Sequence, residues 1–269
     1  MINSNNPILF WVFVIFCNSC ISGSTSNDNV SQNNVLQIDN VEKHVCFVDS
    51  TSFSGLRLYY PSISAIGFQV GEEPDTAVSS ICFSCAASYT GRTIYGHPTS
   101  PLHVDVAGNH VEEGVLYQGY ECPNNTGGFV WYPYPDSSWK IVDRNEYLNR
   151  LSQDSLPGIS FQQELLIHDG EIQQFVRKDR ATLYRALCNL DGQLCIIDGT
   201  REHMLVSFVD LLKNIGVSDA LYLDMGDWSY SWYRDYPEDV EGSKVTIIQE
   251  KPDGRPYYGS NWLIFYYVN

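Results

Sequence analysis

Residues 184–235 constrain the fold most, because their apolar positions change from strand spacing to helical spacing and back. Residues 194–198 predict a strand, and residues 220–223 are continuously apolar, as in a strand buried on both faces. Between them, apolar residues recur at helical spacing: Met204, Leu205, Phe208, Leu211, Leu212 and Ile215. Gly216 follows where a helix C-cap favours a left-handed residue. We expect a βαβ unit near residues 194–224, with a right-handed crossover and parallel strands.

Further strands and one short helix are expected outside this unit. Short apolar segments bounded by Ser, Gly and Pro predict strands at residues 45–48, 56–60, 66–70, 80–87, 161–170 and 261–268. Residues 145–151 predict a short helix, whereas the Gly-, Asn- and Pro-rich residues 89–135 predict loops around a site. No repeat or linker interrupts the chain after Val41. We therefore expect a single α/β (α+β mixed) domain with a mixed β-sheet over residues 41–269.

The N-terminus suggests export. Residues 7–16 are ten consecutive apolar residues, too few to span a membrane but suited to the core of a signal peptide. The following Cys17-Asn18-Ser19-Cys20 resembles the lipobox of bacterial lipoproteins, which implies lipidation of Cys20 and attachment to a membrane. Ordinary secretion and a retained anchor are the alternatives, because no Lys or Arg precedes the apolar run and Cys17 stands where Leu is usual.

These features divide the chain into three parts. Residues 1–20 are expected to be a signal peptide of the lipoprotein type, and residues 21–40, rich in Ser, Asn and Asp, a flexible tether. The remaining residues, 41–269, would form the folded domain. The expected location is the cell envelope or cell surface, or otherwise the periplasm or the medium.

Charge and motifs exclude several classes of function. The chain carries 32 acidic and 16 basic residues, a formal charge of -16 that repels nucleic acid. We therefore expect no nucleic-acid partner, and an anionic substrate would need a local basic pocket. The sequence lacks Gly-x-Ser-x-Gly, Walker, dinucleotide-binding and His-Glu-x-x-His motifs. This disfavours serine hydrolases, nucleotide-binding proteins and zincins.

The cysteines favour a core role. Six follow the apolar run and its lipobox-like end: Cys46, Cys82, Cys85, Cys122, Cys188 and Cys195. This number is low for a disulfide scaffold. Cys82-x-x-Cys85 could form half a zinc site, but it lies in a strand-like run, where buried thiols are the commoner explanation. We predict no cofactor, while a divalent metal, the cysteine pairing and the oligomeric state stay open.

The order of motifs resembles the phosphodiester glycosidase family, the uncovering-enzyme-like domain, and more closely its bacterial secreted or lipoprotein branch. The resemblance is carried by Phe161-Gln162-Gln163, His168-Asp169-Gly170, Tyr184-Arg185-Ala186-Leu187-Cys188, Leu190-Asp191-Gly192 and the segment from Asp219 to Gly226. The family turn Leu-Asp-Gly-Gly-Gly-Ser-Ser is kept at Leu223, Asp224, Gly226 and Ser229. Met225, Asp227 and Trp228 depart from it.

The resemblance implies two catalytic carboxyl groups. Asp224 is the first, because glycosidic cleavage needs a carboxyl group that protonates the leaving oxygen or stabilises an oxocarbenium-like centre. A strand-end carboxylate that caps backbone N–H groups is the alternative. Glu164 is the preferred partner because its strand leads into the same group of motifs. A glutamate without a catalytic role, on the surface of a strand, is the alternative. Asp169, Asp227 and Asp235 are further candidates for the second carboxylate.

Five residues are expected to bind substrate: Arg185, Gly226, Ser229, His110 and Trp228. Arg185 lies near the family's characteristic arginine and could grip a phosphate, or else pair with Asp191 or Asp198. His110, with His97 and His103, could act as an acid–base group, or make ordinary loop hydrogen bonds. Trp228, with Trp232 and Tyr233, could stack on a sugar ring or pack in the core.

The resemblance thus implies an exported hydrolase that cleaves a sugar from a sugar-1-phosphodiester or a related glycoside. The alternative is a non-catalytic surface lipoprotein that binds glycans on the same fold. In the enzyme, Asp224, a second carboxyl group and Arg185 should meet in one pocket. In the binding protein, Asp224 should be buried against backbone, with Trp228 and Trp232 lining an open groove.

Overall fold

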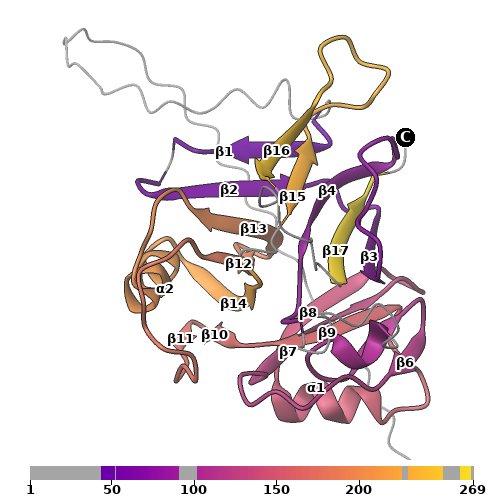
Figure 1. Ribbon diagram of the computed structural model, residues 1–269, viewed down its shortest axis with the longest axis vertical. Coiled ribbons are helices and arrows are strands. Elements are labelled where there is room, and N and C mark those ends of the chain that lie inside the picture. Colours follow the sequence, from indigo (N-terminus) through magenta and orange to yellow (C-terminus); the bar gives the residue numbers. More distant parts are fainter. Residues whose placement is uncertain (1–43, 52, 91–101, 226–229, 251–260, 268–269) are drawn as a thin grey trace, which may run out of the picture. The chain divides into compact units, whose positions relative to one another are not determined.

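The structure, a computed structural model, describes residues 44–51, 53–90, 102–225, 230–250 and 261–267. Strands dominate these residues, and they form three sheets (Figure 1). The expectation of an α+β domain holds in its coarse form, but the expected mixed sheet does not. Every strand pairing within the three sheets of the described chain is antiparallel.

The largest sheet has seven strands and carries most of the motifs described above. Its order is β1-β2-β13-β12-β14-β10-β11. The strands are β1 (Cys46–Asp49), β2 (Leu56–Pro61), β10 (Leu165–His168), β11 (Glu171–Ile172), β12 (Arg185–Leu190), β13 (Gln193–Gly199) and β14 (Val217–Leu223).

The expected strand–helix–strand unit is present as β13, α2 (Leu205–Asn214) and β14, but its two strands are not neighbours. Both run antiparallel to β12, which lies between them, so they run parallel to each other. The cause is the tight turn at Asp191 and Gly192, whose φ values of 52° and 78° suit a two-residue hairpin. That hairpin makes β12 the partner of β13, and β14 adds to the other edge of β12.

Two five-stranded sheets complete the domain. The first, in the order β16-β15-β4-β17-β3, consists of β3 (Ala65–Val70), β4 (Ile81–Ala86), β15 (Ser231–Arg234), β16 (Val245–Gln249) and β17 (Asn261–Tyr266). The second, in the order β6-β5-β9-β7-β8, consists of β5 (His110–Glu112), β6 (Val115–Tyr117), β7 (Gly127–Tyr132), β8 (Ser138–Asp143) and β9 (Ile159–Gln163). Residues 89–135, expected as loops, thus contain β5, β6 and β7.

The helical segments are short. Helix α1 (Arg144–Leu151) begins at Asp143, whose Oδ1 accepts the N–H groups of Asn145 and Glu146 at 2.7 and 3.0 Å. A 3₁₀ segment, η3 (Leu102–Asp105), precedes β5. No helix in the described part of the chain combines the length and hydrophobicity needed to cross a membrane. The expected signal peptide and tether lie outside the described residues.

The seven-stranded sheet is covered on both faces. One face packs against α2, where Phe208 and Leu212 meet Ala186 and Tyr222 in one apolar cluster. The other face contributes Leu187, Ile196, Leu221 and Leu223 to a larger cluster shared with both five-stranded sheets. The alternation of side chains along each strand therefore decides which residues face α2 and which face the shared core.

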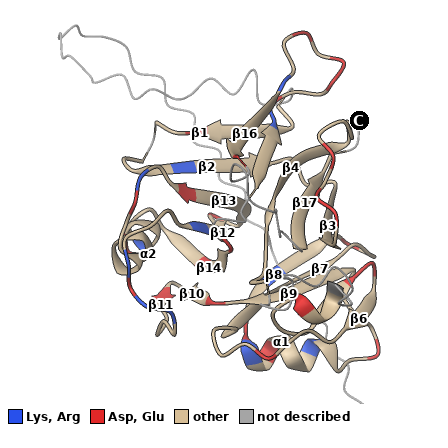
Figure 2. Ribbon diagram, viewed as in Figure 1, with Lys and Arg blue, Asp and Glu red and all other residues tan. Residues whose placement is uncertain are grey.

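The chain passes from one sheet to another at Glu164. Strand β9 ends at Gln163 in the second five-stranded sheet, and β10 begins at Leu165 in the seven-stranded sheet. Acidic and basic residues are spread over several elements rather than gathered on one (Figure 2). A local positive charge must therefore come from individual side chains, and one of these lies beside Glu164.

Candidate functional site

Asp224 is the first residue after β14 and is partly buried. Its backbone N–H donates to the carbonyl oxygen of Ala87, the residue that follows β4, at 3.0 Å. This bond joins the end of β14 to the end of a strand of the first five-stranded sheet. The position expected for a catalytic carboxylate is therefore a junction between two sheets.

A cluster of aromatic rings around one arginine lies next to this junction. The Arg177 guanidinium carbon is 3.8 Å from the centroid of the Tyr222 ring and 5.6 Å from that of Tyr89. Burial opposes the charge of Arg177, but the nearby oxygens of Tyr222, Tyr89 and Glu164 outweigh burial and raise its pKa above the ordinary arginine value. Arg177 is thus a fixed cation in an acidic protein. Burial raises the pKa of Tyr89 and of Tyr222; the charge of Asp224 adds to this rise and that of Arg177 opposes it.

Glu164 holds Arg177 in place. The Glu164 side chain is completely buried, and its Oε1 accepts the N–H groups of Val176 and Arg177 at 2.6 and 3.0 Å. Its Oε2 lies 3.8 Å from Arg177 Nε. The Glu164 carbonyl also accepts the N–H of Tyr222 at 2.9 Å. Glu164, expected as a second catalytic carboxylate, therefore anchors the segment that carries the cation.

Three buried polar atoms of this cluster make no hydrogen bond to the described residues: the Tyr89 hydroxyl, Arg177 Nη1 and Glu164 Oε2. A buried polar atom without a hydrogen bond costs about 1–3 kcal/mol, so native folds retain few of them. These atoms are of both donor and acceptor type, so the cluster can offer hydrogen bonds to a polar ligand.

Sequence reasoning did not identify Arg177, Tyr89 or Tyr222. Arg177 stands in the charged run Arg177-Lys178-Asp179-Arg180, which resembles a solvated loop. Tyr222 lies in a continuously apolar segment, and Tyr89 in a Gly- and Tyr-rich stretch. A possible signal for Tyr222 was its position two residues before Asp224, because alternate residues of a strand share a face.

The structure does not bring Arg185 into this cluster. Arg185 is completely buried and forms a bidentate pair with Asp198, with both N–O distances at 2.7 Å. It pairs across the sheet with Leu223, which faces the shared core, so Arg185 points away from the α2 face that holds Tyr222. Of the two functions considered for Arg185, the ion pair with Asp198 is the one observed.

His110 lies in strand β5 rather than in a loop, and it is completely buried. Its Nε2 is 3.0 Å from Nδ1 of His103, and its Nδ1 is 3.3 Å from the Gly108 carbonyl. Desolvation lowers the pKa of His110 to about 4. His110 is therefore a neutral core histidine at physiological pH, and His103 stacks on Tyr117 beside it. His97 lies outside the described residues.

The remaining expected substrate-binding residues, Gly226, Trp228 and Ser229, also lie outside the described residues, as does Asp227. Trp232 is completely buried and packs with Trp262 and Ile264. It therefore lines no open groove, which removes one of the two tryptophans on which the glycan-binding alternative depended. Tyr233 lies 5.7 Å from Tyr59, centroid to centroid, and packs against the shared core.

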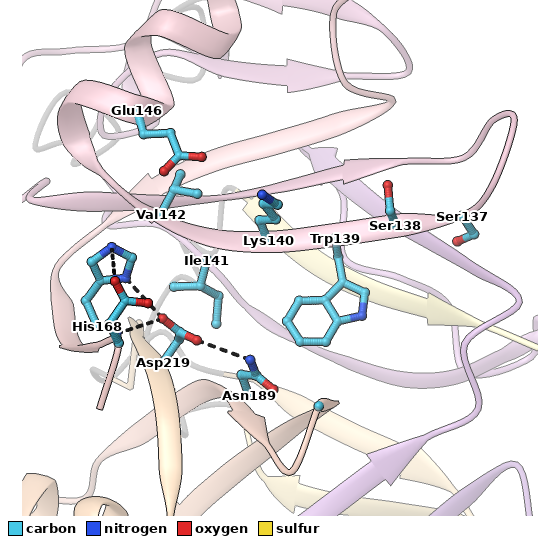
Figure 3. Close-up of a pocket in the computed structure, with 12 residues that line it drawn as sticks. Ser137, Ser138, Trp139, Lys140, Ile141, Val142, Glu146, His168, Asn189 and Asp219 are labelled. Atoms are coloured by element: carbon cyan, nitrogen blue, oxygen red, sulfur yellow. Dashed lines mark hydrogen bonds and ion pairs between the residues drawn. The ribbon is translucent and has the colours of Figure 1, made fainter. Parts of the chain in front are cut away.

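Asp169 lies at the opposite end of β14, in the lining of a cavity of about 590 Å³. Figure 3 shows His168, Asn189 and Asp219 in the same lining. There His168 Nδ1 is 3.0 Å from Asp219 Oδ1, and Asn189 donates to Asp219 Oδ2 at 3.1 Å. Ligand atoms of His168, Asp169 and Asp219 come within 4.8 Å of one another, as a metal site would require. At roughly 3.3 Å per residue, Asp219 and Asp224 are about 16 Å apart along the strand.

The other polar candidates are structural. Asp235 Oδ1 accepts the N–H of Tyr236 at 3.0 Å and of Lys244 at 3.3 Å, so it organises the turn after β15. Cys82 and Cys85 are completely buried, and desolvation raises the pKa of each thiol to about 12. Both are buried thiols in a strand, as the strand-like run that contains them led us to expect.

Comparison with known proteins adds evidence on the fold. No family model and no curated protein matches this sequence. Among solved structures, the catalytic domain of zebrafish N-acetylglucosamine-1-phosphodiester alpha-N-acetylglucosaminidase, auto-inhibited by its pro-peptide, is similar with a TM-score of 0.50 and 12% identity. That match covers 84% of this chain and 83% of the zebrafish chain.

A hypothetical protein from Synechocystis is similar with a TM-score of 0.51 and 9% identity, over 84% of this chain and 62% of that one. Identities this low establish a likeness of fold and leave the activity to the geometry of the site. The chain therefore has a fold similar to that of the catalytic domain of a phosphodiester glycosidase.

Proposed function

We propose that this protein is an exported hydrolase that cleaves a sugar from a sugar-1-phosphodiester or a related glycoside, at the site around Asp224. One observation carries the proposal. A partly buried carboxyl group at a strand end lies within electrostatic reach of two tyrosines, whose rings contact a fixed guanidinium in a cluster with polar atoms that are not all hydrogen-bonded. Such a combination suits a substrate with both an anionic and a sugar part.

Each group has a role that fits its chemistry. The Arg177 guanidinium would bind the phosphate, which is the role that the sequence had suggested for Arg185. Tyr89 offers a ring face and a hydroxyl group to a sugar. Tyr222, whose ring lies under Arg177 and whose hydroxyl accepts the N–H of Met225, would position the guanidinium. Asp224 would act at the anomeric carbon, as base, nucleophile or electrostatic stabiliser of the oxocarbenium-like transition state. Glu164 would keep the guanidinium in position.

Two further observations support the reaction class and the location. The zebrafish protein of similar fold is named for the cleavage of an N-acetylglucosamine-1-phosphodiester. The apolar run at residues 7–16, followed by the lipobox-like Cys17-Asn18-Ser19-Cys20, supports export with a lipid anchor at Cys20. The acidic net charge of -16 argues against a polyanionic partner such as nucleic acid.

A substrate screen tests the proposal. The purified full-length chain is incubated with α-linked sugar-1-phosphodiesters that differ in the sugar, and the release of free sugar is measured with and without a chelator. We expect release from at least one substrate. The chelator arm distinguishes a reaction carried by these side chains from one that a cation assists. Absence of release from the whole panel, by a protein shown to be folded, would contradict the proposal.

A further inference from the structure

Asp105 is a buried carboxyl group whose role is not explained by the fold. It is the last residue of η3, its side chain is completely buried, and neither carboxyl oxygen makes a hydrogen bond to the described residues. Burial raises the pKa of this carboxyl group above the ordinary aspartate value. A carboxyl group in this state costs stability, which is more readily understood if it serves a function.

The backbone places Asp105 next to the candidate site. Val106 forms an antiparallel bridge with Thr90, and Ala107 donates its N–H to the carbonyl of Tyr89 at 3.0 Å. Residues 106–107 therefore run antiparallel beside residues 89–90. Two residues before Tyr89, the carbonyl of Ala87 accepts the N–H of Asp224. Asp105 and Asp224 thus flank one stretch of chain, which carries Tyr89.

Tyr120 connects the two carboxyl groups. Its N–H donates to the Val106 carbonyl at 3.0 Å, which fixes it beside Asp105. Burial, then Cys122, then the charges of Asp224 and Asp105 raise the pKa of the Tyr120 hydroxyl. The phenol is therefore within the electrostatic reach of both carboxyl groups, although they lie far apart in the sequence.

Glu164 is already engaged as an anchor. Its Oε1 accepts two backbone N–H groups, and its Oε2 faces Arg177. Asp105 has no such partner among the described residues, and burial favours the protonated form of its carboxyl group. Glycosidases commonly use two carboxyl groups in contrasting environments, one of which keeps a proton for the leaving oxygen. Asp105 has the environment of this proton donor.

We propose that Asp105 is the second carboxyl group of the site and donates a proton to the leaving oxygen of the substrate. This inference rests on the proposed hydrolase function. The bond between the anomeric carbon and the leaving oxygen breaks, its electron pair stays on that oxygen, and the oxygen takes the Asp105 proton. Water supplies the oxygen that bonds to the anomeric carbon and gives up a proton to the carboxylate of Asp224. Proton exchange with solvent restores both groups.

The test compares leaving groups. Aryl glycosides of the sugar released in the substrate screen, with leaving phenols from strongly acidic to weakly acidic, are hydrolysed by the wild type and by Asp105→Asn. A weakly acidic phenol needs the proton, whereas a dinitrophenol leaves without it. We expect Asp105→Asn to reduce kcat about 100-fold or more on the weakly acidic phenol and less than about tenfold on the dinitrophenol. Exposed Asp154→Asn is the control and should leave both rates unchanged.

The outcomes separate this inference from the proposed function. If the wild type turns over and Asp105→Asn slows all leaving groups equally, or none, Asp105 is not the proton donor, and the hydrolase function stands. If the substrate screen shows no release of sugar by the wild type, both ideas fail together. Should Asp105→Asn not fold, Asp105→Glu replaces it. Because the glutamate keeps a proton to donate, its rates should depend on the leaving group as weakly as those of the wild type, and a steep dependence would overturn the proposal.

Discussion

The guanidinium of Arg177 lies over the ring of Tyr222, 3.8 Å from its centroid. Tyr222 stands two residues before Asp224, so this contact fixes a positive charge near the carboxylate at the end of β14. Glu164, at the junction of β9 and β10, lies 3.8 Å from Arg177 Nε and accepts the backbone N–H of Arg177. Strand β14 thus provides Asp224, and its neighbours provide the cation.

The first prediction concerns substrate recognition by Arg177. In Arg177→Lys the charge remains, but the planar fork and its stacking on Tyr222 are lost. We expect KM for a phosphodiester substrate to rise about tenfold or more, since a hydrogen bond to a charged group contributes about 1.5–3 kcal/mol. KM for an uncharged aryl glycoside of the same sugar should change far less. An equal rise for both substrates would show that Arg177 maintains the shape of the site and does not bind phosphate.

The second prediction concerns the ion pair of Arg185 with Asp198. Asp198→Asn leaves a buried guanidinium without its counter-charge, which should lower the free energy of unfolding by about 3–5 kcal/mol. Chemical denaturation measures this change. Asp191→Asn, on the same hairpin, is the control and should be nearly neutral, because asparagine also tolerates the φ of 52° at that exposed turn. If Asp198→Asn were as stable as the wild type, the ion pair of Arg185 with Asp198 would not contribute to stability.

The third prediction concerns pH. Burial lowers the pKa of His110 to about 4, whereas a histidine in the unfolded chain titrates near 6.5. Between these values the unfolded state binds a proton that the folded state does not. Stability should therefore be fully present above pH of about 6.5 and fall as the pH drops toward 4, by about 3 kcal/mol in all.

Denaturation of the wild type and of His110→Gln at several pH values tests this expectation. The variant should lose this part of the acid destabilisation, while the acid titration of exposed carboxylates continues in both proteins. His203→Gln is a useful comparison, because His203 is also buried, beside Gly55. Parallel stability curves for the wild type and His110→Gln would contradict a neutral buried His110.

Much of the local structure could be predicted from hydrophobic spacing. The strand at residues 194–198, the helix between Met204 and Ile215 and the strand at residues 220–223 all correspond to observed elements. The pairing of these strands could not be predicted from hydrophobic spacing. Whether β14 adds to β13 or to β12 depends on the tight turn at Asp191 and Gly192, which assigns β12 to β13 first.

The candidate site was predicted less completely, for a physical reason. Asp224 was recognisable because a polar residue ends an apolar strand. Tyr89, Glu164, Arg177 and Asp105 come from segments distant in the sequence, and sheet contacts bring them together. Arg185 could not be distinguished from a phosphate ligand by sequence, since only the strand alternation shows that it faces the shared core. Gly226, Trp228 and Ser229 stay predictions.

The central claim, that Asp224 carries out the chemistry, is tested most directly by Asp224→Asn. The rate of sugar release from the best substrate of the screen is compared with that of the wild type, with circular dichroism as a check of folding. Exposed Asp154→Asn, in the segment after α1, is the matched control. We expect a loss of about 100-fold or more in kcat for Asp224→Asn and none for the control. Unchanged turnover by a folded Asp224→Asn protein would contradict the assignment.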